Sequence, residues 1–210
     1  MRKYIPISIA FFIICIFLLH YLIFKNKNAD QQSAINELII ADFNDHPNKI
    51  GDPAYTNLGG QYGVWNRFED DPTQSCTLSF SHLDAFKNGS SVQLTYDVDS
   101  PNPAYNGFWM KLNDLDATHY NTLNIYIRGE GKRFTKRLKV ELKDNYTTAS
   151  YVVHQITNNW KKFSISFEKY NAIQDWASLY EFVIVFDDII SNPKSGVILI
   201  DHVSLSLEHN

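Results

Sequence analysis

Cysteine and basic residues are both scarce in this chain of 210 residues. The two cysteines are Cys15, in an apolar N-terminal run, and Cys76, in the later part of the chain. A membrane would separate them, so we expect no intrachain disulfide. Acidic residues outnumber basic ones by 23 to 19, and the formal net charge is −4 at pH 7. Because nucleic-acid binding requires a basic surface, we expect no nucleic-acid partner.

Motifs of common enzyme classes are also missing. The sequence holds no nucleophile elbow, no His-Glu-x-x-His and no Cys-His pairing. The histidines beyond the N-terminal run lack the spacing of a zinc site. They are His46, His82, His119, His154, His202 and His209. The glycine-rich stretch at 57–65 leads into a predicted strand, whereas a phosphate-binding loop leads into a helix.

The N-terminus carries a predominantly apolar run of 21 residues, without Asp, Glu, Lys or Arg, from Tyr4 to Phe24. As a helix it would span roughly 30 Å, the hydrocarbon thickness of a bilayer. We therefore predict a signal-anchor helix over 1–24, followed by a polar linker over 25–36. The run is longer and bulkier at its end than most cleaved signals, although cleavage is the alternative. Arg2 and Lys3 favour a cytoplasmic N-terminus, which would make this a single-pass membrane protein with a periplasmic or extracellular domain.

From residue 37 onward, apolar and polar residues alternate in short stretches. The alternation at 92–98 and at 123–128 is typical of strands that bury one face. Two stretches, 182–186 and 197–207, are apolar on both faces, so we expect them to be central or covered strands. About ten such stretches between turn signals predict an all-β sandwich or barrel. A short turn near 175–180 is the one helix candidate.

Seven stretches occur in an order that carries a family resemblance. They are LIIADFND, NLGGQYGVW, NGFWMKL, DATHYNTLNIYIRGEG, RLKVELKD, ITNNWKKFSI and GVILIDHVSL. Over residues 37–207 the chain resembles the galactose-binding-like jelly rolls of family 11 carbohydrate-binding modules, and equally the complex I intermediate-associated protein family. The resemblance implies a jelly-roll β-sandwich, which in many relatives binds polysaccharide on one sheet face and often holds a structural calcium ion.

A calcium site is expected where the first and last strands of the domain pair. Asp42 and Asn44 lie on the first strand and Asp201 on the last, and calcium prefers carboxylate and carbonyl oxygens. Related domains often read Asp-Phe-Glu where this chain reads Asp42-Phe43-Asn44. The amide is a weaker ligand than the carboxylate it replaces, so calcium remains a candidate cofactor.

Four residues are predicted to form a binding face because the alternation turns them away from the core. They are Trp109, Tyr126, Arg128 and Glu141. Flat aromatic rings beside polar side chains suit the C–H faces and hydroxyls of a sugar. Tyr62 and Trp65 are placed at the edge of the same cleft. The alternative is that a loop covers the face, so that Trp109 only packs, and that Trp65 lies in the core.

Catalysis is the less favoured interpretation. A glycosidase needs two facing carboxylates, for which Glu141 and Asp97 are candidates. A lyase would use residues such as Arg128, Tyr126 and His154. The function expected first is a membrane-tethered, non-catalytic module that binds a glycan on one sheet face. A protein-binding assembly or scaffold domain is the alternative, followed by a polysaccharide lyase or glycosidase.

Overall fold

A computed structural model describes residue 18, residues 20–21, residues 37–44 and residues 54–208. The chain divides into two compact units, Met1–Leu38 and Ile39–Asn210. In the first unit, residues 18, 20 and 21 are helical, and the rest of the predicted anchor and all of the predicted linker lie outside the described residues. No helix within the described part of the chain has the length and apolar character needed to cross a membrane.

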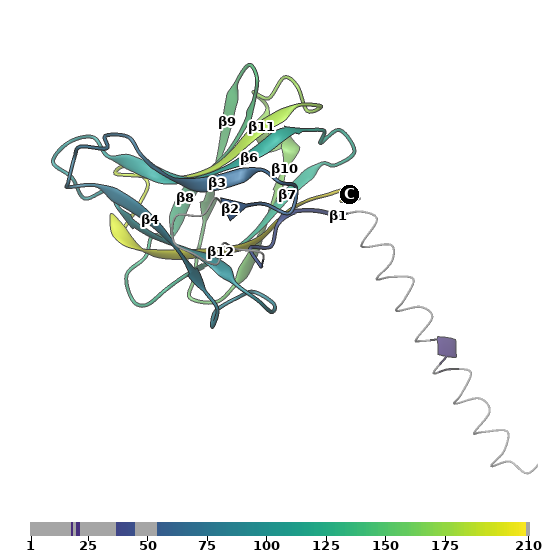
Figure 1. The fold of residues 1–210 in the computed structure, drawn as a ribbon, viewed down its shortest axis with the longest axis horizontal. Coiled ribbons are helices and arrows are strands. Elements are labelled where there is room, and N and C mark those ends of the chain that lie inside the picture. The colour runs from purple at the N-terminus through teal and green to yellow at the C-terminus, as the bar shows by residue number, and fades with distance from the viewer. Residues whose placement is uncertain (1–17, 19, 22–36, 45–53, 209–210) are drawn as a thin grey trace, which may run out of the picture. The chain divides into compact units, whose positions relative to one another are not determined.

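The second unit is built from strands, in agreement with the alternating sequence pattern (Figure 1). The strands are β1 (Glu37–Ala41), β2 (Ala54–Tyr55), β3 (Gln61–Asn66), β4 (Ser75–Ser81), β5 (Ser91–Asp97), β6 (Tyr105–Leu115), β7 (Thr122–Gly129), β8 (Arg137–Asp144), β9 (Thr148–His154), β10 (Lys161–Ser166), β11 (Leu179–Asp187) and β12 (Ser195–Ser206). One 3-10 helix, η1 (Phe167–Tyr170), follows β10.

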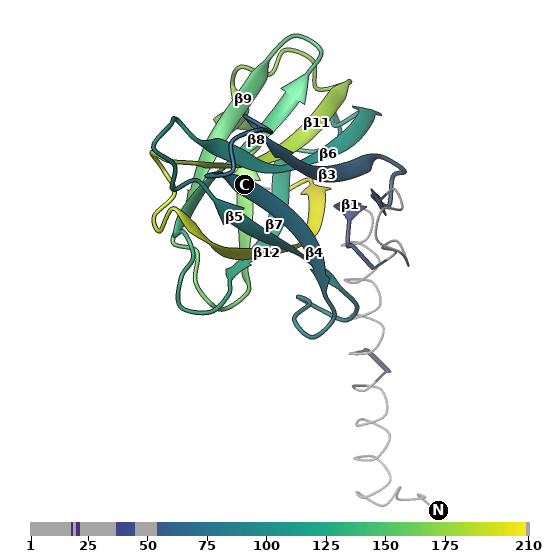
Figure 2. The same ribbon diagram turned by 60° about the vertical axis from the view of Figure 1, so that its left-hand side comes forward.

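Two six-stranded sheets pack face to face, as the turned view in Figure 2 shows. The first sheet has the order β10-β7-β12-β5-β4, with β1 paired to β12, and the second has the order β2-β3-β6-β11-β8-β9. The prediction of an all-β sandwich is confirmed. The two stretches that are apolar on both faces became β11 and β12, which lie inside the sheets as expected.

The core lies between the sheets and follows from the two-residue period of a strand. Along β6, Phe108 and Met110 are fully buried, while Trp109 between them is only partly buried on the other face. The rings of Tyr96 on β5 and Phe186 on β11 stack across the core and so connect the two sheets. Their centroids lie 4.1 Å apart, at an interplanar angle of 8°. Each strand of the second sheet therefore presents its other face outward.

Two local expectations were wrong. The predicted helical turn at 175–180 contains only a turn and the start of β11, and the short helix lies earlier, at η1. Its N-terminus is capped by Ser166, whose side chain accepts a hydrogen bond from the Glu168 amide. The glycine-rich stretch at 57–65, expected to precede a strand, itself contains the first five residues of β3, which begins at Gln61.

Candidate functional site

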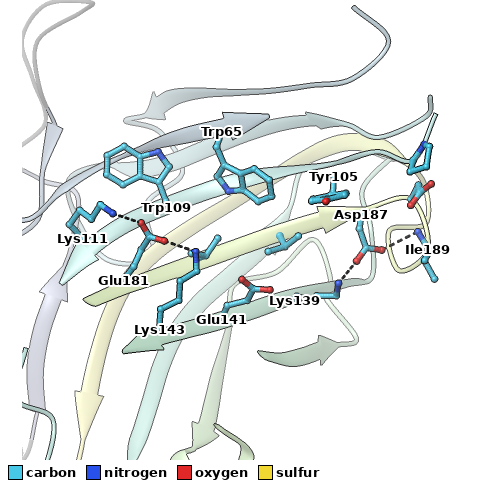
Figure 3. Close-up of a pocket in the computed structure, with 14 residues that line it drawn as sticks. Trp65, Tyr105, Trp109, Lys111, Lys139, Glu141, Lys143, Glu181, Asp187 and Ile189 are labelled. Carbon is cyan, nitrogen blue, oxygen red and sulfur yellow. Dashed lines mark hydrogen bonds and ion pairs between the residues drawn. The ribbon is translucent and has the colours of Figure 1, made fainter. Parts of the chain in front are cut away.

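A groove of about 710 Å³ runs over the outer face of the second sheet (Figure 3). Strands β3, β6, β11 and β8 supply most of its side chains, and the loop after β11 closes one end. The lining residues are Trp65, Pro103, Tyr105, Trp109, Lys111, Lys139, Glu141, Lys143, Glu181, Val183, Val185, Asp187, Asp188 and Ile189. Because paired strands hold these side chains, the groove rests on a rigid base.

Three aromatic side chains form one side of the groove, in the order Trp109, Trp65 and Tyr105 (Figure 3). Each tryptophan lies opposite a glycine of the neighbouring strand, Trp109 opposite Gly63 and Trp65 opposite Gly107. A Cβ at Gly63 would lie 3.1 Å from the Trp109 ring, and one at Gly107 would lie 3.3 Å from Nε1 of Trp65. Gly63 thus provides the space in which the Trp109 indole lies close to the sheet, whereas a Cβ at Gly107 would meet the backbone carbonyl of Ile184 before it met Trp65.

Charged side chains of β8 form the opposite side of the groove. Lys139, Glu141 and Lys143 alternate along the strand, so all three project from the same face. Between the two sides lies β11, whose Val183 and Val185 give the groove an apolar floor. The groove therefore offers ring faces on one side and hydrogen-bonding groups on the other.

Ion pairs between neighbouring strands hold the lysines of the groove. Glu181 of β11 bridges Lys111 of β6 at 2.6 Å and Lys143 of β8 at 2.7 Å. Asp187 pairs with Lys139 at 2.6 Å. Burial raises the pKa of Glu181, but its hydrogen bonds and ion pairs with the two lysines outweigh burial and lower the pKa overall. Asp187 behaves in the same way, so both carboxylates stay ionised.

Glu141 differs from these paired carboxylates. Burial raises its pKa, and the charges of Lys143 and Lys139 do not offset that effect. Among the described residues no hydrogen-bond or ion-pair partner is recorded for its carboxylate, although it faces the groove (Figure 3). Glu141 is thus a half-buried acceptor available to a ligand.

Three of the six predicted binding residues line this groove, namely Trp65, Trp109 and Glu141. The prediction that Tyr62 edges the binding cleft is wrong. Tyr62 is buried in the core against Phe43 and Phe108 and does not line the groove. Gly63 and Trp65 lie on the outer face of β3, so the alternation of the strand turns the adjacent Tyr62 inward.

The prediction that Tyr126 and Arg128 share a face with Trp109 is wrong. Both residues belong to β7 of the first sheet and so project from the opposite side of the sandwich. A loop covers them there. Phe86 stacks on Tyr126 with their ring centroids 3.5 Å apart, and Oδ1 of Asp84 lies 2.8 Å from Nη1 of Arg128. Alternation indicated correctly that these side chains leave the core, but it cannot assign a strand to a sheet.

Several groove residues were missed by the sequence analysis. They are Tyr105, Lys111, Lys139, Lys143, Glu181 and Asp187. The alternation around Trp109 and Glu141 already placed Lys111, Lys139 and Lys143 on the outer faces of their strands, whereas Tyr105 lies before the stretch in which it was seen. Glu181 and Asp187 had no such signal, because β11 is apolar on both faces between them.

Asp201 lies on β12, which pairs with β1 as expected, but Asp42 and Asn44 follow the end of β1 at Ala41 and so are not on the strand. Asp201 is buried, and its two oxygens accept hydrogen bonds from the amides of His202 and Phe86 at 2.7 and 2.8 Å. Burial raises the pKa of Asp201, and the negative charge of Asp42 raises it further. Asn44 accepts a hydrogen bond from the Ser90 amide through its side-chain oxygen, at 3.0 Å.

The described residues contain no cluster of three or more His, Cys, Asp or Glu side chains suited to a metal ion. Calcium stays a prediction.

The two catalytic arrangements considered from the sequence are not assembled in the described part of the chain. Asp97 lies on β5 of the first sheet, whereas Glu141 lies on β8 of the second. Likewise Arg128 and Tyr126 lie on the first sheet and His154 on the second.

No protein-family model and no curated protein matches the chain. Solved structures do match. A family 11 carbohydrate-binding module from Clostridium thermocellum, in complex with a β-1,3-1,4-mixed-linked tetrasaccharide, has a TM-score of 0.57 at 16% identity, covering 83% of this chain and 98% of that one. The domain has the jelly-roll fold of these modules. An exo-β-agarase matches at a TM-score of 0.52 and 8% identity, over 82% of this chain and 25% of that one. At such low identities the likeness concerns the fold, and the site must carry any argument about function.

Proposed function

We propose that this domain is a non-catalytic carbohydrate-binding module that takes a polysaccharide chain into the groove of the second sheet. The observation that carries the proposal is the row of Trp109, Trp65 and Tyr105 facing the hydrogen-bonding row of β8. A sugar ring has apolar C–H faces and polar hydroxyl edges, so it suits a site with these two sides.

The dimensions of the groove favour a chain of several sugars. Its volume of about 710 Å³ lies within the usual range for ligand sites. Three aromatic side chains in succession offer more ring surface than one sugar can cover. The tetrasaccharide bound by the Clostridium thermocellum module of the same fold supports this interpretation.

We further propose that residues 1–24 anchor the module in a membrane, with the domain outside the cytoplasm. The 21-residue apolar run supports this proposal. An anchored module stays near the cell surface, which raises its effective concentration against a polymer with many binding positions.

The test is binding of the full chain, in detergent, to a panel of neutral, acidic and amino-sugar oligosaccharides. Trp109→Ala and Trp65→Ala should each weaken binding about thirty-fold, because loss of an aromatic contact at a binding surface costs about 2 kcal/mol. The matched control is Trp160→Ala, since Trp160 lies against Phe86 and outside the groove.

Each outcome of this test decides something. Binding that the groove variants lose and the control retains supports the proposal. No binding to any oligosaccharide overturns it in favour of a protein-binding domain, and shortened oligosaccharides in the mixture overturn it in favour of an enzyme.

A further inference from the structure

We infer that the preferred ligand is a polysaccharide with free, protonated amino groups, such as a de-N-acetylated hexosamine polymer, and that Glu141 is its counter-charge. This inference rests on the proposed function, because it concerns the same groove. It follows from which charged groups of the groove are already paired and which are available.

All three lysines of the groove are engaged by acids of β11. Lys111 and Lys143 share Glu181, and Lys139 pairs with Asp187. An anionic sugar, such as a uronic acid, would have to break one of these ion pairs before a lysine could bind it. The broken pair would leave Glu181 with one lysine instead of two, or Asp187 with none, and the loss is costly because both carboxylates have little exposed surface. The groove is therefore poorly suited to acidic polymers.

Two carboxylates of the groove remain available. Neither Glu141 nor Asp188 forms an ion pair with any residue that the structure describes, and both line the groove. The lining residues include four carboxylates and three ammonium groups, so the groove carries an excess of negative charge. A cationic ligand balances that excess, whereas a neutral one leaves it in place.

Glu141 is flanked by two lysines on its own strand, and these do not replace a counter-ion. Lys139 and Lys143 each direct their ammonium group to an acid of β11, at 2.6 and 2.7 Å. Burial still raises the pKa of Glu141 in their presence. An ammonium group bound beside Glu141 would supply the attraction that the flanking lysines do not.

The aromatic side of the groove is compatible with a cation. Indole faces attract ammonium groups through their ring electrons, and Lys111 Nζ already lies 5.6 Å from the centre of the Trp109 ring. A glucosamine-type sugar could therefore place its ring over an indole and its ammonium group towards Glu141.

The test compares oligomers of equal length in binding to the full chain, at a pH at which sugar amines are protonated and Glu141 is ionised. The probes are a glucosamine oligomer, the same oligomer N-acetylated, and a neutral β-glucan oligomer. We expect the glucosamine oligomer to bind about ten-fold more tightly than either, as one additional charge-assisted contact would give. Glu141→Gln should remove that advantage, so that the glucosamine oligomer binds the variant no more tightly than the β-glucan oligomer does. Glu69→Gln, at an exposed turn, should leave the advantage in place.

The outcomes separate this inference from the proposed function. If β-glucan or the acetylated oligomer binds through the groove as tightly as the glucosamine oligomer, the inference fails and the proposed function stands. Equal loss of all three ligands in Glu141→Gln also overturns the inference, because Glu141 would then serve the fold or hydroxyl binding. If none of the three binds, both fail.

Discussion

Trp109 of β6 lies directly opposite Gly63 of β3, and its indole lies 3.1 Å from the position that a Cβ of residue 63 would occupy. With the strands exchanged, Trp65 of β3 lies opposite Gly107 of β6, and its Nε1 lies 3.3 Å from the position of a Cβ at residue 107. Glycine weakens a strand interior, so two such positions need a reason. At Gly63 the reason is the Trp109 indole, which lies close against the sheet. At Gly107 it is first the backbone carbonyl of Ile184 on the neighbouring strand, with the Trp65 indole beside it.

A side chain at residue 63 should therefore damage binding more than folding. In Gly63→Val, the branched side chain must push the Trp109 ring off the sheet, and we expect glycan affinity to fall by about ten-fold. Valine favours strands, so the melting temperature should change little. Isothermal titration and thermal unfolding measure the two effects. The matched control is Gln61→Val, an exposed position of the same strand outside the groove, and equal affinities of the two variants would contradict the prediction.

Glu181→Gln should destabilise the protein at neutral pH. It removes the charge that Lys111 and Lys143 share while leaving both ammonium groups beside a neutral amide. Hydrogen bonds between charged groups contribute roughly 1.5–3 kcal/mol, so we expect a loss of about 1–3 kcal/mol in the free energy of unfolding. The pKa of Glu181 is lowered in the folded state, so the native protein gains this stability above its unfolded pKa and loses it as the pH falls through the folded pKa. Denaturant unfolding at neutral and acidic pH should show the difference shrinking in acid.

Glu141→Gln should stabilise the protein at neutral pH, the opposite of the effect expected for Glu181→Gln. Burial raises the pKa of Glu141 above its ordinary value of 4.5, so ionisation in the folded state costs stability as the pH rises through the folded pKa. The Gln variant avoids that cost. We expect it to melt at a higher temperature than the native chain near pH 7, and at about the same temperature below roughly pH 4, where the carboxyl is protonated in both states. A lower melting temperature at neutral pH would show that the charge of Glu141 stabilises the fold.

The strands of this domain could be predicted from the sequence because a period of two reports directly which side chains leave the core. That rule placed Trp109 and Glu141 correctly on outer faces. It failed for Tyr126 and Arg128, since an outward residue of β7 and one of β6 lie on opposite sides of the sandwich. Sheet assignment depends on pairing between distant segments, such as β6 with β11, and local alternation contains no information about it.

The groove was harder to predict than the strands for a related reason. Glu181 and Asp187 belong to a stretch that is apolar on both faces, so they read as the ends of a buried strand. Their role depends on lysines of neighbouring strands, and only the register brings these together. Glu181, for example, lies opposite Lys111 in one pairing and Lys143 in the other.

The calcium prediction can be tested by thermal unfolding of the full chain. If calcium binds only the folded state near Asp42 and Asp201, a hundred-fold excess over Kd should add about 2.7 kcal/mol of stability, and a chelator should remove it. Asp42→Ala and Asp201→Ala should each abolish the response. Asp42→Ala is the more informative variant, because Asp201 also accepts two backbone hydrogen bonds that the fold needs. An identical melting curve with chelator and with calcium rules out the site.

The final prediction concerns the N-terminal segment. A predominantly apolar helix of 21 residues behind Arg2 and Lys3 should remain in the bilayer, because removing it would expose its apolar surface to water. We expect the full-length protein to stay in the membrane fraction after an alkaline carbonate wash, which strips proteins that are only peripherally bound. A protease added outside the cells should digest the domain from residue 37 onward, whereas cytoplasmic protease should not. Deletion of residues 1–24 is the control and should give a form that the wash releases. A shortened soluble protein produced from the intact gene would show instead that the segment is a cleaved signal, and the surface-tethering part of the proposed function would then fail while glycan binding in the groove would not.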